Sequence, residues 1–108
     1  MQHDNSPAAV RGRAEKVFFC LSPGRGNAVK GEDVRRLTGL PDRAMRKALE
    51  SLRRGGVVIC ADDSGYFLPE TEGELRAYIG QEQHRLDAVA LNLEAARALL
   101  EGGAMNEL

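Results

Sequence analysis

Apolar side chains in the first part of the chain recur at intervals of three and four residues, the repeat of a helix with one buried face. Ser6 and Pro7 stand directly before this pattern, and a serine N-cap followed by proline is a common helix start. Ser22-Pro23-Gly24 breaks the pattern. We therefore expect a helix that begins at about Pro7 and buries Val10, Ala14, Val17, Phe18 and Leu21.

A short second helix is predicted after a turn at 24–27 and a brief strand at 28–30. Its inward-facing residues are expected to be Val34 and Leu37. Gly39 suits the left-handed residue that ends such a helix, and Leu40 can reach the core from the turn. Pro41 is expected to open the helix that follows.

The third helix is predicted from about Asp42 to Arg54, and Gly55-Gly56 ends it. Its apolar residues form one buried stripe, made of Met45, Ala48, Leu49 and Leu52. The residues left outside this stripe are mostly basic, namely Arg43, Arg46, Lys47 and Glu50. Residues 57–60 and 66–68 are rich in strand-forming side chains, and the turn-forming residues 62–65 between them predict a β-hairpin.

A long helix is predicted after Pro69, because Thr71 and Glu74 have the spacing of a capping box. It continues to Gly102-Gly103, a length of roughly 45 Å. Alternating steps of four and three define one line of positions, called the seam below: Leu75, Ile79, Glu82, Leu86, Val89, Leu93, Ala96 and Leu100. Three short helices cannot bury so long a seam, so we expect a homodimer through it. Glu82 either fixes the register of that dimer or faces solvent.

The net charge of −1 conceals two segments of opposite sign. Residues 25–54 contain nine basic and four acidic side chains, a net charge of +5. Residues 61–108 contain three basic and ten acidic side chains, a net charge of −7. A polyanion would be attracted to the middle of the chain and repelled by its end. The same charges also fit two ordinary solvated faces, and charge alone does not decide between these interpretations.

Length and composition indicate one small soluble domain, with 108 residues of which 43% are hydrophobic. No apolar run approaches the roughly 20 residues that span a bilayer. Residues 1–10 lack the basic and hydrophobic regions of a signal peptide, so we expect a cytoplasmic protein without a membrane partner. Cys20 and Cys60 lie in apolar runs without CxxC spacing and are expected to be small buried side chains.

Patterns that predict catalysis are missing from the sequence. Gly24-Arg25-Gly26 lacks the Gly-Lys-Ser/Thr that a phosphate-binding loop needs. His3 lies in the tail that is expected to be flexible, and His84 has no partner at metal-ligand spacing. The carboxylates of the last helix are expected to be solvated. We therefore expect no enzyme, and no catalytic residue, metal or cofactor.

A family resemblance rests on the run EDVRRLTGLPDRAMRKALESLRRGGVVI. Its Gly-Leu turn, basic third helix, glycine pair and strand resemble the winged helix-turn-helix superfamily over about residues 10–69. The expected fold class is mainly α with a small β-hairpin wing. It has a winged helix at 7–69, a long C-terminal dimerisation helix at 70–102, and flexible tails at 1–6 and 103–108. The segment GYFLPETEGELRAYIGQEQHRLDAVALNLEAARALL is also similar to the end of small winged-helix proteins of bacteriophages and prophages.

In that superfamily the third helix enters the major groove of DNA. The resemblance implies base and phosphate contacts from Arg43, Arg46 and Lys47. It implies phosphate contacts from Arg35, Arg36, Arg53 and Arg54. The implied function is sequence-specific binding of double-stranded DNA by a homodimer, as a transcriptional regulator of bacterial or phage type.

A second function stays open because Asp62 and Asp63 stand where many DNA-binding wings carry lysine or arginine. The wing would then be held away from DNA, or the same fold would bind protein. In that alternative the chain is an interaction module that docks a protein partner in a replication or phage assembly through its acidic wing and tail.

Overall fold

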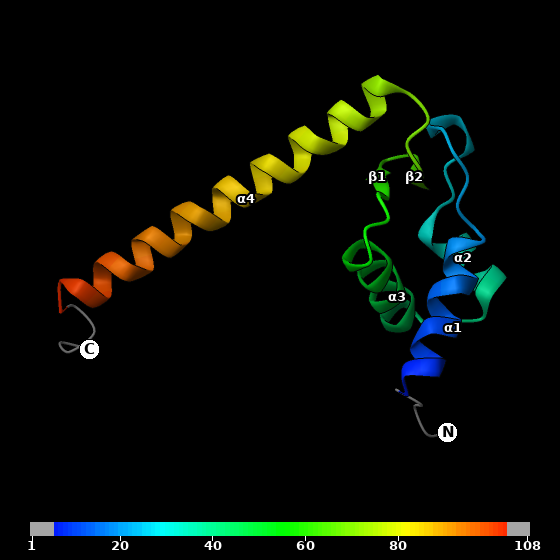
Figure 1. Ribbon diagram of the computed structural model, residues 1–108, viewed down its shortest axis with the longest axis horizontal. Coiled ribbons are helices and arrows are strands. Elements are labelled where there is room, and N and C mark those ends of the chain that lie inside the picture. Colours follow the sequence, from blue (N-terminus) through cyan, green and yellow to red (C-terminus); the bar gives the residue numbers. More distant parts are fainter. Residues whose placement is uncertain (1–5, 104–108) are drawn as a thin grey trace. The chain divides into compact units, whose positions relative to one another are not determined.

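The computed structural model describes residues 6–103, and most of the chain is helical (Figure 1). The elements in chain order are α1 (Pro7–Phe18), η1 (Arg25–Asn27), α2 (Gly31–Thr38), α3 (Asp42–Arg54), β1 (Cys60–Asp62), β2 (Gly65–Phe67) and α4 (Glu72–Glu101). These elements confirm a mainly helical protein with a small hairpin and a long C-terminal helix. The chain divides into two compact units, Met1–Leu75 and Arg76–Leu108, and each is described by itself. Apart from Ser6 and Gly103, the tails predicted at 1–6 and 103–108 lie outside the described residues.

Helix α1 begins as predicted, because the Ser6 hydroxyl accepts a hydrogen bond from the Ala9 N–H at 3.2 Å. It ends at Phe18, earlier than the break predicted at residues 22–24. The prediction that Phe18 is buried is wrong, since this residue is 38% exposed. With the helix already ended, Leu21 reaches the core from the turn that follows.

The turn between α2 and α3 follows the prediction at Gly39, which has a φ of 72° and ends α2. Val34 is fully buried, but the prediction for Leu37 is wrong, because its side chain is 60% exposed. Leu40 from the turn packs against the core instead. Pro41 stands at the N-cap of α3, one position before the place expected for it.

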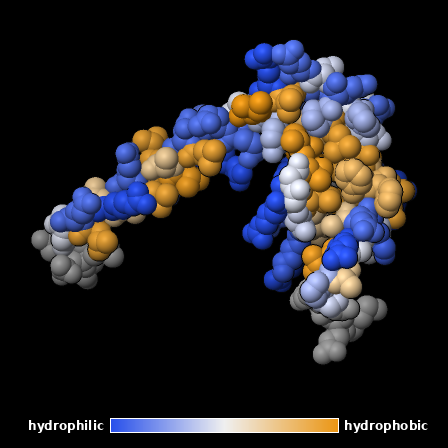
Figure 2. All heavy atoms as spheres, in the orientation of Figure 1, coloured by the Kyte–Doolittle hydropathy of each residue, from blue (hydrophilic) through white to orange (hydrophobic). Residues whose placement is uncertain are grey.

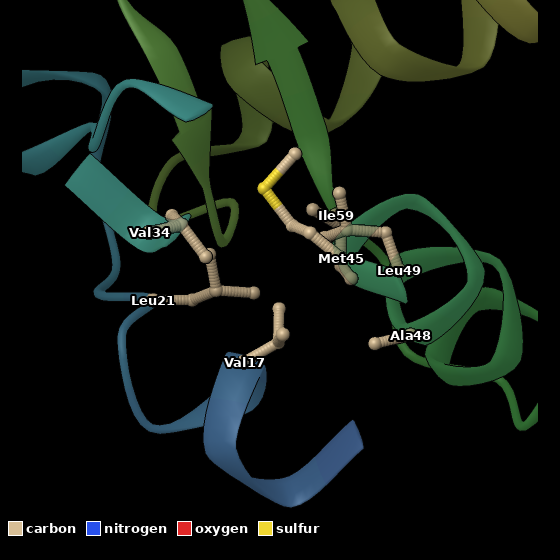
Figure 3. Close-up of a cluster of buried hydrophobic side chains, with 7 residues drawn as sticks. All are labelled: Val17, Leu21, Val34, Met45, Ala48, Leu49 and Ile59. Atoms are coloured by element: carbon tan, nitrogen blue, oxygen red, sulfur yellow. The ribbon is translucent and has the colours of Figure 1, made fainter. Parts of the chain in front are cut away.

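One hydrophobic core holds the N-terminal unit together, as Figure 3 shows. Helix α3 contributes its inner face to it, and Leu52 packs at its margin. The buried cluster consists of Val17, Leu21, Val34, Met45, Ala48, Leu49 and Ile59. Because α1, α2 and the segment before β1 all pack on the inner face of α3, its outer face is held toward solvent.

The hairpin pairs β1 with β2 in antiparallel register, with Cys60 opposite Phe67. Strand β1 starts three residues later than predicted, and Val57 packs against the core without a strand partner. The brief strand predicted at 28–30 is a single bridge. In it the Val29 N–H donates to the Tyr66 carbonyl at 3.0 Å, and the Tyr66 N–H donates to the Val29 carbonyl at 2.8 Å. The segment before α2 is thereby attached to the hairpin.

Helix α4 begins at Glu72, after Thr71, whose hydroxyl accepts a hydrogen bond from the Glu74 N–H at 3.1 Å. The reciprocal bond of the predicted capping box is replaced, because the Glu74 carboxylate accepts from the Glu70 N–H at 2.8 Å. No residue of α4 is buried. Among residues 6–103, no helix combines the length and apolar character needed to cross a membrane.

Candidate functional site

The outer face of α3 carries three exposed cations, Arg43, Arg46 and Lys47, which we call the basic face. They lie at spacings of three and four residues, so they share one side of the helix. Within residues 6–103, the side chains of Arg43 and Lys47 form no hydrogen bond or ion pair. The buried stripe of α3 behind them fixes their backbone while their charged ends remain in water.

Asp42, in the first turn of α3, binds two arginines at once. Its Oδ2 accepts from Arg46 Nε at 2.8 Å, and its Oδ1 accepts from Arg35 Nη1 of α2 at 2.7 Å. The bond from Arg46, followed by that from Arg35, holds the pKa of the Asp42 carboxyl below its ordinary value. Because Asp42 uses only Nε of Arg46, the two terminal nitrogens of this guanidinium stay available to a second acceptor.

The other arginines predicted to contact phosphate are engaged within the unit. Arg36 Nη2 lies 3.1 Å from Asp33 Oδ1, and Arg54 Nη2 lies 2.5 Å from Glu50 Oε1. Both are exposed ion pairs, which typically contribute about 0 to 1 kcal/mol and exchange easily for other partners. Arg53 differs, because its Nη2 donates to the Ile59 carbonyl at 2.9 Å and so ties the end of α3 to the segment before β1.

An open depression of about 250 Å³ lies between α2, α3 and the hairpin. It brings together two predicted cations, Arg35 and Arg46, with Lys30, which the site prediction left out. The Lys30 ammonium donates a hydrogen bond to the Asp63 carbonyl. Lys30 is the last residue of the predicted strand at 28–30, and it could have been included if that strand had been placed against the hairpin.

A second, larger groove of about 550 Å³ runs between α1 and α3. Lys47 and Arg54 line it from α3, and Arg13 adds a third cation from α1. Arg13 is another residue that the site prediction missed. Its charge was visible in the sequence, but only the packing of α1 against α3 brings it beside the basic face.

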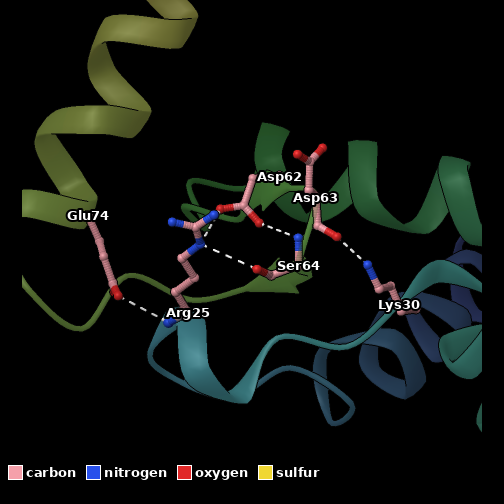
Figure 4. A network of polar contacts seen from close by, with 6 residues as sticks. All are labelled: Arg25, Lys30, Asp62, Asp63, Ser64 and Glu74. Carbon is pink, nitrogen blue, oxygen red and sulfur yellow. Dashed lines mark hydrogen bonds and ion pairs between the residues drawn. The ribbon is translucent and has the colours of Figure 1, made fainter.

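The hairpin is less acidic toward solvent than its two aspartates suggest (Figure 4). The Asp62 carboxylate lies 2.9 Å from Arg25 Nε and accepts from the Ser64 N–H at 2.7 Å. The Arg25 backbone N–H in turn donates to the Glu74 carboxylate at 3.0 Å. Of the two hairpin aspartates, Asp63 is the one whose side chain has no polar partner within residues 6–103. One free negative charge therefore remains at the tip of the hairpin.

Metal-ligating side chains do not gather in the described part of the chain. Residues 6–103 contain no group of three or more histidines, cysteines or acidic residues placed to hold a metal ion. Cys60 is buried and Cys20 is half-buried, and both are free thiols. Burial raises the pKa of both thiols, which disfavours their reactive thiolate forms.

Comparisons of this chain with protein-family models, with curated proteins and with solved structures find no match.

The contribution of Asp42 to stability is expected to depend on pH. Because its pKa is lower in the folded protein than in the unfolded chain, the contribution is complete above the ordinary pKa of about 4. This contribution to stability is lost as the pH falls through the lowered pKa of Asp42 in the folded protein. We expect Asp42→Asn to lower the urea midpoint at pH 7, and the difference from the native protein to shrink as the pH falls below about 4. A difference that stays constant over this range would contradict the assignment.

Proposed function

We propose that the N-terminal unit is a winged helix-turn-helix that binds double-stranded DNA with α3 in the major groove. The order of its elements supports the fold, with three helices followed by a hairpin. The bridge between Val29 and Tyr66 adds support, because it attaches the segment between the first two helices to the hairpin. In this proposal the chain acts as a homodimer through α4, as a transcriptional regulator of bacterial or phage type.

The observation that carries the proposal is the basic face. Three cations project from one side of a helix whose other side is buried, and two of them have no partner within residues 6–103. The major groove of B-DNA is wide enough to admit such a helix, and unpaired cations gain most from the phosphates at its edges. Arg43 and Lys47 are assigned to phosphate or base contacts on this ground.

Arg46 is assigned to direct reading of a guanine. Guanine presents two acceptors, O6 and N7, in the major groove, and the fork of an arginine matches them. The Asp42 carboxylate holds Arg46 by Nε, so both terminal nitrogens remain for the base. Arg36 and Arg54 position the protein by exchanging their exposed ion pairs for phosphate, and Arg35 does so from its part-buried pair with Asp42. Arg53 stays with the Ile59 carbonyl.

Binding of a labelled DNA duplex, followed by fluorescence anisotropy as salt is raised, tests this function. Arg43→Ala and Lys47→Ala should each weaken binding and lower the slope of log affinity against log salt by about one. Arg11→Ala is the matched control, because it removes one exposed positive charge from α1 rather than from α3. It should leave the slope unchanged. Absence of binding at low salt, or equal losses in all three variants, would overturn the proposal.

A further inference from the structure

The seam of α4 is open to solvent along its length. Its large apolar side chains Ile79, Leu86, Val89, Leu93 and Leu100 are between 49% and 72% exposed. Figure 2 shows hydrophobic residues at the surface of this helix in the view drawn. An apolar line of this extent on a monomer marks an interaction surface. A helix in water also gains most of its stability from packing such a face.

We propose that α4 pairs with α4 of a second copy in antiparallel orientation, with the helices overlapping fully about a centre between Asp87 and Ala88. This inference rests on the homodimer in the proposed function and is independent of DNA binding. Around that centre every seam position meets another seam position. Leu75 lies opposite the partner's Leu100, and Leu86 lies opposite the partner's Val89.

Glu82 is the residue that selects this orientation. In a parallel pair in register, each seam residue meets its own copy, so two Glu82 carboxylates would share one layer and repel. In the antiparallel pair Glu82 faces the partner's Leu93. Its carboxylate can stay at the edge of the seam with Arg85, whose Nη2 lies 2.6 Å from Glu82 Oε2.

Side-chain size supports the same choice. A parallel pair would stack Ala96 on its own copy and leave space in that layer. The antiparallel pair sets the partner's Ala96 against the larger Ile79. It also brings Tyr78, which flanks the seam, beside the partner's Leu99, which is 53% exposed in the single chain. The antiparallel pair thereby avoids both unfavourable layers of the parallel pair, namely the layer with two Glu82 carboxylates and the layer with two Ala96 side chains.

Distances between spin labels on the full-length chain, measured by electron paramagnetic resonance without DNA, test the orientation. Cys20 and Cys60 are first replaced by alanine, and one label is attached through Ala77→Cys, Ala88→Cys or Ala98→Cys, all on α4 and off the seam. The antiparallel pair predicts a separation of about 30 Å along the axis for labels at 77 and at 98. It predicts that labels at 88 lie side by side.

Three short distances would show a parallel pair, and a monomer of 11.8 kDa would show that α4 does not pair with a second copy. Either result overturns the inference. Because no DNA is present, a failure of DNA binding cannot produce these outcomes.

A second variant tests the role of Glu82. Glu82→Leu should tighten the dimer by about tenfold or more, and it should add a short-distance population for labels at 77, because the repulsion that excludes the parallel pair is gone. Glu94→Leu makes the same change off the seam and should alter neither quantity. An unchanged distance distribution in Glu82→Leu would contradict the selection of orientation by this residue.

Discussion

Replacing Met45 with alanine is expected to lower the free energy of unfolding of the N-terminal unit by about 2 to 5 kcal/mol. Met45 is 1% exposed, and it projects from the inner face of α3 into the cluster that joins α1, α2 and Ile59. Truncation removes buried contacts and leaves a cavity at the centre of this small core. A loss of this size is a large part of the stability of a small domain.

Hydrogen exchange of the α3 amides measures this loss without interference from α4. Leu37→Ala is the matched control, because it truncates an apolar side chain that is 60% exposed on α2. It should change stability by no more than about 0.5 kcal/mol. Equal effects of the two variants would mean that the core is not centred on Met45.

Gly65→Ala is expected to have the second-largest effect on stability, a loss of about 2 kcal/mol or more. Gly65 has a φ of 121°, which disfavours any residue with a Cβ. A Cβ there would also lie 2.3 Å from the Val29 carbonyl oxygen, which is backbone and cannot turn aside. The substitution must therefore open the bridge between Val29 and Tyr66.

The same chemical change in α1 should act in the opposite direction. A Cβ at Gly12 would meet no atom within 4 Å, and the residue lies inside the helix. Gly12→Ala should therefore raise stability by up to about 1 kcal/mol through helix propensity. Thermal unfolding followed by circular dichroism compares the two variants. A stabilising Gly65→Ala would contradict the close approach of the hairpin to residues 29 and 30.

The bounds of helix α3 could be predicted from the sequence, because Pro41 marks its start and Gly55 marks its end. The apolar stripe between them marks the face that is buried. The exposure of Phe18 and Leu37 could not be predicted, because a helical repeat gives the direction of a side chain but not the extent of the core. Strand β1 starts late for a related reason. Val57 is strand-forming and apolar, yet it packs on the core with no neighbouring strand to pair with.

The cations of the candidate site were visible in the sequence, but their partners were not. Asp42 binds one arginine four residues away on its own helix, which spacing suggests, and another from α2, which only the folded chain brings near. Lys30 and Arg13 join the neighbouring grooves through tertiary packing. Sequence therefore indicated which helix carries the charge, while the fold determines which charges remain free.

A titration of isotope-labelled protein with duplex DNA, followed by amide chemical shifts in nuclear magnetic resonance, tests most directly whether α3 contacts DNA. The largest shift changes are expected at Arg43, Arg46 and Lys47, with smaller ones at Lys30 and the tip of the hairpin. Residues of α4 should stay unchanged. Shift changes confined to α1 or α4, or no changes at a salt concentration where basic proteins bind DNA, would contradict the proposed role of the basic face.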